Sequence, residues 1–213
     1  MAESTFSINC QRCERLANYL VTSQQKYPHY YCKPVPAFGD PDARLLIVGL
    51  APGLHGANAT ARPFTGDHAG IILYQTLHKF GFSSHAESIS VNDGLKLINA
   101  RITNAVKCVP PQNKPTGEEI KNCNLYLREE LSALQGPHVL LALGRIAHES
   151  ILRACDIRLK AFPFAHGAEH QLNEHLLLVD SYHCSRYNTQ TRRLTVEQFE
   201  AIFARINTLL NSQ

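Results

Sequence analysis

Short, continuously apolar stretches alternate along the chain with longer stretches in which apolar residues recur at helical spacing. The apolar stretches have the length of strands buried on both faces, and they cover residues 44–50, 100–106, 138–144 and 175–181. The helical stretches cover residues 14–26, 69–80, a segment that opens at Thr116, 145–154 and 195–211. Because strands that alternate with helices form βαβ units, we predict an α/β fold with three layers, α/β/α, around a central, mostly parallel four-stranded sheet.

Composition narrows the class of protein. With 213 residues, 44% of them hydrophobic and 18% charged, the chain is long and apolar enough to fold as one domain, residues 1–213, without disulfide bonds. It has no run of about 18 apolar residues and no basic segment followed by an apolar one at its start. We therefore expect a cytoplasmic protein with no membrane contact. The net charge of +3 permits nucleic-acid binding but does not indicate it.

The seven cysteines are an odd number, so a complete set of disulfide bonds would leave one over. Cys10 and Cys13 form a CxxC pair, which in a cytosolic protein is more often metal-binding or redox-active than structural. Cys108 and Cys123 lie far downstream and offer two further thiols. The other three have no close partner in sequence and are interpreted as small buried apolar residues: Cys32, Cys155 and Cys184.

The connection between the first predicted strand and the next helix is long for an α/β protein. It runs from Gly49 to Asp67 with four glycines and two prolines, whereas such connections usually take about 2–6 residues. Its glycines fit either turns or a phosphate-binding loop, but the absence of a following Gly-Lys-Ser/Thr excludes a Walker A motif. The ring of Phe64 either packs on the hydrophobic core or offers an exposed surface for stacking. Asp67 either caps the following helix or takes part in chemistry.

In open parallel sheets ligands bind beyond the carboxyl ends of the strands, so we expect chemistry after the first, second and fourth predicted strands. Asn104 ends the second strand and offers a donor and an acceptor for an amide-like edge, although an Asn in a turn is the commoner role. His183 follows the fourth strand, where sheet meets solvent. Beyond it lie Arg186, Arg192 and Arg193 with no acidic residue between them, a cluster that alone is typical of a solvated loop.

Together these segments resemble three motifs of the uracil-DNA glycosylase superfamily, and most closely those of its family 5, the type-b enzymes. The matching segments are, in chain order, GLAPGLHGANATARPFTGD, ITNAVKCVPPQNKP and SYHCSRYNTQTRRLT. With the cysteines, the resemblance extends from Cys10 to Thr195 and covers nearly the whole chain. One position departs from the family pattern, which usually has glycine where this chain has Arg192.

The resemblance implies a role for four of the cysteines. Families 4 and 5 carry a [4Fe–4S] cluster on four cysteines, and the matching positions here are Cys10, Cys13, Cys108 and Cys123. Four thiolates suit the charge and softness of such a cluster, but a tetrahedral zinc site would use the same set. Spacing leaves both open, and the resemblance favours iron and sulfur.

The resemblance also implies a binding pocket for a flipped base. In it, Phe64 stacks on uracil, Asn104 hydrogen-bonds the edge of the base, and backbone groups of Leu50 and Ala51 complete the pocket. His183 donates a hydrogen bond to the negative charge that develops on the leaving uracil, which is an oxyanion-type role.

The water that attacks the sugar needs a positioning group. Many superfamily members carry an Asp, Asn or Glu just inside the first motif, where this chain has the apolar stretch Leu50-Ala51-Pro52. Asp67 is the nearest carboxylate, and the matching Asp is implicated in family 5. The motifs place no lysine to attack the sugar. We therefore expect a monofunctional hydrolase that excises uracil, and other deaminated bases, and so initiates base excision repair.

The resemblance further implies contacts with uracil-containing DNA, double- and single-stranded, made by a monomer. Arg186 and Tyr187 follow His183 and are expected to enter the duplex and fill the vacated stack. Arg192, Arg193 and Lys114 are expected to contact DNA, the two arginines as phosphate ligands.

Two other functions remain open at this point. The first is a non-catalytic iron–sulfur or zinc protein that binds DNA with the same fold. The second is a nucleotide-binding α/β redox protein. A redox protein has no need of the HGAN…FTGD loop, and an inactive glycosylase would tolerate the loss of Asp67 or His183, both of which are present.

Overall fold

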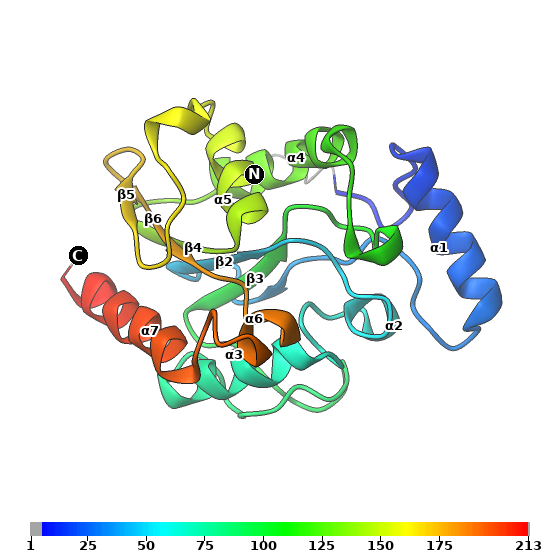
Figure 1. Cartoon of the computed structure of the whole chain (residues 1–213), viewed down its shortest axis with the longest axis horizontal. Coiled ribbons are helices and arrows are strands. Elements are labelled where there is room, and N and C mark those ends of the chain that lie inside the picture. Colours follow the sequence, from blue (N-terminus) through cyan, green and yellow to red (C-terminus); the bar gives the residue numbers. More distant parts are fainter. Residues whose placement is uncertain (1–5, 213) are drawn as a thin grey trace.

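The computed structural model describes residues 6–212, so the outermost residues of the predicted domain, 1–5 and 213, lie outside the described part. Its strands are β1 (Phe38–Gly39), β2 (Leu45–Gly49), β3 (Ala100–Asn104), β4 (His138–Leu143), β5 (Glu169–Gln171) and β6 (Leu176–Ser181). They form one sheet in the order β1-β3-β2-β4-β6-β5 (Figure 1).

The four central strands confirm the predicted parallel sheet. β2 pairs in parallel with β3 on one side and with β4 on the other, and β4 pairs in parallel with β6. The sheet is nevertheless not purely four-stranded, because β1 and β5 add antiparallel edges beside β3 and β6. These edges have only two and three residues, Phe-Gly and Glu-His-Gln, and are too short to carry an apolar pattern.

The helices are α1 (Glu14–Lys26), α2 (Ala57–Thr60), α3 (His68–Lys79), α4 (Gly117–Ser132), α5 (Arg145–Ala154), α6 (Arg186–Gln190) and α7 (Val196–Asn211). Short 3₁₀ turns occupy Pro111–Asn113 and Leu159–Ala161. The five predicted helices are confirmed, and Thr116 and Glu119 form the expected capping box at the start of α4. Sequence patterning missed α2 and α6, which have four and five residues and therefore show no helical period.

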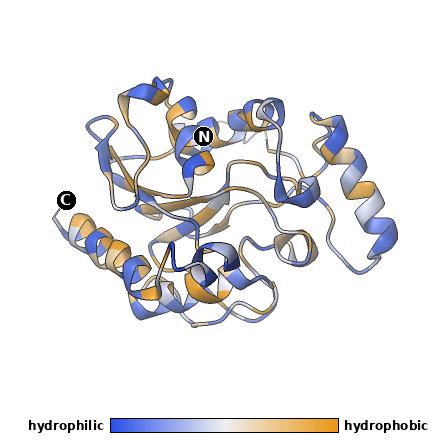
Figure 2. Ribbon diagram, viewed as in Figure 1, coloured by the Kyte–Doolittle hydropathy of each residue, from blue (hydrophilic) through white to orange (hydrophobic). Residues whose placement is uncertain are grey.

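The sheet lies between two layers of helices, and its strands alternate between them. Leu45 and Ile47 of β2 belong to the apolar cluster beneath α3 and α7, whereas Leu46 and Val48 belong to the cluster beneath α4 and α5. Because both faces are covered, β2, β4 and most of β6 are apolar, and the ribbon is hydrophobic through the centre of the molecule (Figure 2).

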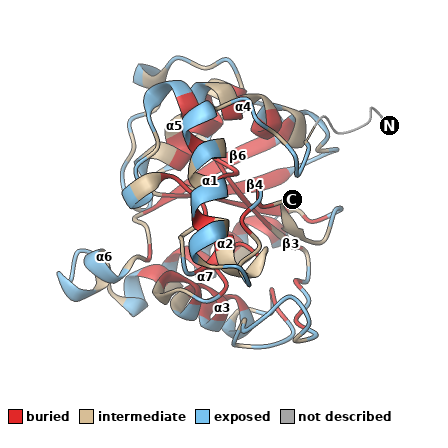
Figure 3. Ribbon diagram, turned by 90° about the vertical axis from the view of Figure 1, so that its right-hand side faces the viewer, coloured by how far each residue is buried: buried red, intermediate tan, exposed pale blue. Residues whose placement is uncertain are grey.

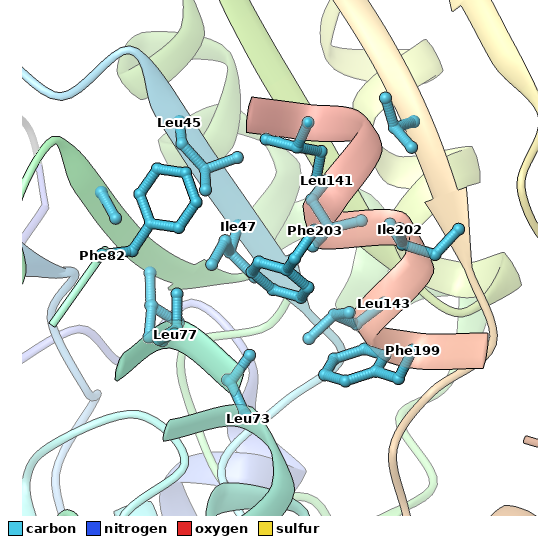
Figure 4. Close-up of a cluster of buried hydrophobic side chains, with 14 of the residues drawn as sticks. Leu45, Ile47, Leu73, Leu77, Phe82, Leu141, Leu143, Phe199, Ile202 and Phe203 are labelled. Atoms are coloured by element: carbon cyan, nitrogen blue, oxygen red, sulfur yellow. The ribbon is translucent and has the colours of Figure 1, made fainter. Parts of the chain in front are cut away.

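The larger cluster fixes α3 and α7 to the sheet. Phe199 and Phe203 of α7 pack with Leu73 and Leu77 of α3 against Ile47 of β2 (Figure 4). Burying one such side chain contributes about 1.5–3 kcal/mol to stability. The contacts hold the beginning of α3, and the loop that precedes it, at a fixed position relative to the carboxyl end of β2.

Candidate active site and cysteine cluster

A cleft of about 570 Å³ lies beyond the carboxyl ends of the four parallel strands. Its walls come from the segments after β2, β3, β4 and β6, as expected for an open α/β sheet. Leu50 and Ala51, which follow β2, line the cleft. The segment after β4, Gly144 to Ile146, also lines it. We did not predict this wall, because α5 begins directly after β4 and leaves no loop with a polar motif.

Asn104 is the last residue of β3, and its side chain reaches the cleft from a buried position with 3% of its surface exposed. Its side-chain oxygen Oδ1 is buried and has no hydrogen-bond partner. A buried polar atom without a partner costs about 1–3 kcal/mol. The neighbouring Gly49 gives this amide room, since a Cβ there would clash with Oδ1 and would lie 2.8 Å from the ring of Phe64. The site therefore carries an unsatisfied acceptor that a ligand can satisfy.

Phe64 both packs on the core and lines the cleft, so its two sequence interpretations are compatible. Its backbone has φ +55°, a left-handed conformation that is rare for an aromatic residue. Its carbonyl lies so close to Gly70 in α3 that a Cβ at Gly70 would clash with it. The ring is stacked with that of His183, with centroids 5.8 Å apart and planes at 28°. The packing around the turn therefore holds this ring at one wall of the cleft.

His183 lies two residues beyond β6 and is half-buried at the cleft. Burial lowers the pKa of its imidazole to about 4, so the ring is neutral near pH 7. Its backbone carbonyl accepts a hydrogen bond of 2.8 Å from the side-chain nitrogen of Asn188 in α6. The ring therefore offers one N–H donor and one acceptor from a position that α6 helps to fix.

Asp67 caps α3 and also lines the cleft. Its Oδ1 accepts a hydrogen bond of 2.9 Å from the backbone N–H of Gly70. Its Oδ2 faces the turn at Gly56, where an added Cβ would lie only 2.6 Å from that oxygen. Burial raises the pKa of the carboxyl, although hydrogen bonds from Gly70 and Ala69 oppose the shift. One carboxylate oxygen is thus engaged by the helix, and the other stands beside the glycine-rich loop.

The segment after β6 is not an open loop, because α6 occupies Arg186–Gln190 and stands out from the molecule (Figure 3). Ser185 begins α6, and its side chain accepts a hydrogen bond from the N–H of Asn188. Arg186 and Tyr187 lie at the rim of the cleft, and Tyr187 is 70% exposed.

The three other predicted DNA contacts lie outside the cleft lining. Arg192 has φ +56°, which explains why glycine is favoured at this position in the family that the sequence resembles. Arg193 packs its guanidinium 4.6 Å from the ring centroid of Tyr182. Lys114 is exposed, and it is its neighbour Asn113 that lines the cleft.

Cys10, Cys13, Cys108 and Cys123 line a second, smaller cavity, so the structure brings together the four predicted metal ligands. The hydroxyl of Tyr126 donates to Cys10 Sγ over 3.1 Å, and the backbone N–H of Lys107 donates to Cys123 Sγ over 3.2 Å.

Burial and the other thiols raise the pKa of Cys108, and burial raises that of Cys123 to about 11. Of the three cysteines interpreted as apolar residues, Cys32 and Cys184 are buried and Cys155 is half-buried.

Within residues 6–212 one group has side-chain donors clustered as metal ligands would be, namely His148, His170 and Asp180. Hydrogen bonds account for it. The two ring nitrogens of His148 lie 2.7 Å from Asp180 Oδ1 and 2.9 Å from the carbonyl of Phe162. Nε2 of His170 lies 3.3 Å from Asp180 Oδ2. The network ties β6 to α5 and β5 just below His183.

The fold and the cleft define an α/β protein whose site combines the amide of Asn104, the ring of Phe64, the imidazole of His183 and the carboxylate of Asp67. A family model described as the Uracil DNA glycosylase superfamily matches residues 36–207. The chain is 47% identical to the type-5 uracil-DNA glycosylase of Thermus thermophilus over 195 residues, 89% of each chain.

It is 41% identical to that of Pyrobaculum aerophilum over 202 residues, which are 93% of this chain and 88% of the relative. Identity to a type-4 uracil-DNA glycosylase of Archaeoglobus fulgidus is 30% over 181 residues, 82% of this chain and 81% of the relative. The chain belongs to the uracil-DNA glycosylase superfamily and, within it, to the type-5 enzymes. The resemblance found in the sequence is thereby confirmed.

In the described part of the chain, no helix combines the length and the apolar character that crossing a membrane requires.

Proposed function

We propose that this protein excises uracil from DNA by hydrolysing the N-glycosidic bond, as the first step of base excision repair. The observation that carries the proposal is the cleft, in which Asn104, Phe64, His183 and Asp67 come together from three separate segments of the chain. The names of its type-5 relatives support the same substrate. We further propose that the whole chain acts as one catalytic domain, that it is a monomer, and that it accepts other deaminated bases.

Recognition of uracil rests on Asn104 and Phe64. The unpartnered Oδ1 of Asn104 is an acceptor for an N–H of the base, and its amide NH₂ is a donor for a carbonyl of the base. Phe64 supplies a ring for stacking. The carbonyl of Leu50 already accepts the N–H of Val106 over 2.9 Å, so the strand end beneath the base is rigid.

Bond cleavage rests on His183 and Asp67. As the glycosidic bond breaks, positive charge develops on the sugar and negative charge on uracil. The neutral ring of His183 donates its N–H to the uracil anion, and the carboxylate of Asp67 positions the attacking water and accepts its proton. The step balances, because water gives its OH to the sugar and its H⁺ to the carboxylate of Asp67, and uracil leaves as the anion.

The test of the function is incubation of the protein with a duplex that contains one uracil. The expected products are free uracil and an intact strand with an abasic site, which breaks only after alkali. A duplex with thymine at the same position is the control. No release of uracil would overturn the proposal and favour a DNA-binding protein without activity.

The segment around α6 is proposed as the element that enters the duplex, and Arg186 and Tyr187 as the residues that fill the vacated stack. Replacing both by alanine is expected to slow excision most from a U:A pair, less from U:G and least from single-stranded DNA. The reason is that unpairing and unstacking cost a few kcal/mol in a duplex and less where the base is mismatched or unpaired. Single-turnover rates on the three substrates provide the measurement.

Arg192→Ala and Arg193→Ala serve as controls, since we propose that these arginines contact phosphates. Each is expected to weaken binding evenly on all substrates and to reduce the slope of log affinity against log salt by about one. If the Arg186/Tyr187 double variant loses the same factor on all three substrates, α6 positions His183 and does not enter the duplex.

We propose that the four cysteines hold a [4Fe–4S] cluster. A tetrahedral zinc ion would use the same four thiolates, and the sequence resemblance to families 4 and 5 favours the cluster. The structure supports the shared site because the four cysteines line one cavity. When bound, the cluster supplies a structural brace, because the cysteines join the segment before α1 to α4 and to the segment after β3.

The freshly purified protein is therefore expected to be brown, with broad visible absorbance and iron in place of zinc. Cys108→Ala is expected to lose both colour and thermal stability, because one of the four ligands is removed. Cys155→Ala is the matched control and is expected to retain both, since Cys155 lies outside the cavity. Metal analysis that finds one zinc per chain and no iron would contradict the assignment.

A further inference from the structure

An aromatic cluster outside the cleft has no role in the chemistry described above. It consists of Tyr27 and Tyr30, which follow α1, and His55, which belongs to the loop after β2. The two tyrosine rings are stacked, with centroids 4.7 Å apart and planes at 13°. The imidazole of His55 meets both rings edge-on, at 5.4 Å from Tyr27 and 5.9 Å from Tyr30. We call these three residues the aromatic platform.

The platform is attached to the wall of the cleft. His55 lies between Gly53 and Ala57, both of which line the cleft, but its own side chain is exposed on the outside of the loop. The segment that carries the tyrosines is held against α2 by backbone hydrogen bonds, among them Tyr31 N–H to the carbonyl of Ala59 over 3.2 Å. The end of α1 and α2 accordingly lie side by side (Figures 1 and 3).

The two segments that carry the platform have no acidic residue beside the rings. Between Glu14 and Asp40 the basic residues are Arg15, which pairs with Glu119 over 2.7 Å, Lys26 and Lys33, and the loop from Leu50 to Gly66 has no acidic residue either. The exposed ammonium group of Lys26 lies 5.3 Å from the ring centroid of Tyr27. No carboxylate in these two segments repels a phosphate group.

A hydrogen bond orients the imidazole of His55. The hydroxyl of Tyr30 and Nδ1 of His55 are 2.9 Å apart. When the hydroxyl donates to Nδ1, the ring proton is on Nε2, and Nε2–H is a donor directed away from Tyr30. The side chain is exposed, so this donor is accessible from solvent. Packing of the segment after α1 on α2 would account for the tyrosine stack but not for an exposed imidazole that a hydrogen bond holds in one orientation.

We propose that the aromatic platform and Lys26 bind the DNA strand that flanks the target nucleotide. Lys26 and His55 Nε2–H contact phosphates, and the exposed edge of the tyrosine stack contacts a neighbouring nucleotide. Aromatic rings within a positively charged surface are the general means by which proteins bind a nucleic-acid strand without reading its sequence. The inference rests on the proposed function, because it takes DNA as the substrate in the cleft.

The test measures dissociation constants for duplexes with a non-cleavable 2′-fluorinated deoxyuridine, in three forms: long on both sides, truncated on the 5′ side, and truncated on the 3′ side. The variant is Lys26→Ala/Tyr27→Ala, and Lys160→Ala is the control that removes one positive charge elsewhere. We expect the wild type to lose about tenfold in affinity on truncation of one side. The double variant should bind the long duplex about tenfold more weakly than the wild type does. Truncating the same side should then weaken its binding no further.

Tyr30→Phe tests the orientation of His55, because it keeps the ring and removes the hydroxyl. Its expected effect is weaker binding of the long duplex alone, whereas Tyr31→Phe, which removes a hydroxyl in the same segment, should bind as the wild type does. Excision at saturating enzyme should stay unchanged in every variant.

The proposal would be overturned if the double variant bound all three duplexes more weakly by the same factor, or bound all three as the wild type does. A slower saturated rate would also overturn it, because the platform would then support the cleft loop. Failure of wild-type protein to release uracil would instead overturn the proposed function.

Discussion

Replacing Asp67 by asparagine is expected to slow single-turnover excision of uracil by about 10²–10⁴-fold and to leave the unfolding temperature nearly unchanged. Asparagine caps a helix as well as aspartate does, so the hydrogen bond to the N–H of Gly70 survives the substitution. An amide does not accept the proton of the attacking water. The rate is measured with enzyme in excess over a uracil-containing duplex, and stability by thermal unfolding.

Asp67→Ala is the companion variant, because it removes the cap together with the carboxylate. It should match the asparagine variant in rate and in addition lose about 0.5–2 kcal/mol of stability. If Asp67→Asn excises uracil at the wild-type rate, Asp67 is a helix cap only, and another group positions the water.

The pH dependence of the excision rate further separates the role of Asp67 as a proton acceptor from its role as a helix cap. Burial raises the pKa of the Asp67 carboxyl, and the deprotonated form is the one that accepts a proton. As the pH falls through this raised pKa, the excision rate should fall, and at a higher pH than an ordinary aspartate would give. The residual rate of Asp67→Asn should lack this acidic limb.

Much of this site follows from the sequence because a general rule places it. Strands buried on both faces are mainly apolar, so β2, β3, β4 and β6 were predicted, and the carboxyl ends of parallel strands share one edge of the sheet. That rule brings the segments with Phe64, Asn104 and His183 together without knowledge of any contact. The role of Asp67 as a cap was likewise one of two interpretations of its position before a helix, and the structure confirms it.

The parts that the sequence did not predict depend on tertiary contacts or on very short elements. β5, with the sequence Glu-His-Gln, is a strand only because β6 offers it an edge. Gly144 lines the cleft as part of a helix start and carries no side chain to signal it. Arg193 rests on the ring of Tyr182, a residue eleven positions earlier that no periodic pattern relates to it.

His183→Ala is expected to lower the single-turnover rate of uracil excision by about 10²–10³-fold while the affinity for DNA stays nearly constant. The hydrogen bond that it removes is made mainly in the transition state, when negative charge has developed on the base. His175→Ala, at an exposed position outside the cleft, is the control and should leave both quantities unchanged.

The pKa of His183 defines which form of the ring makes that bond. Burial lowers the pKa to about 4, so the ring is neutral above this pH, and the donor is the N–H of a neutral imidazole. The wild-type rate should therefore not decline between about pH 5 and pH 8 on account of His183. A decline over this range that is absent from His183→Ala would mean that a protonated ring is the active form.

The same pKa has a consequence for stability. In the unfolded chain the pKa of a histidine is about 6.5, above the value of about 4 in the folded protein. Between these values the unfolded state binds more protons, so acid should destabilise the fold as the pH falls from about 6.5 to about 4. His183→Ala should show a smaller decrease in unfolding free energy over this range. An identical decrease in both proteins would show that the folded ring titrates like an exposed histidine, and that burial does not keep it neutral below about pH 6.5.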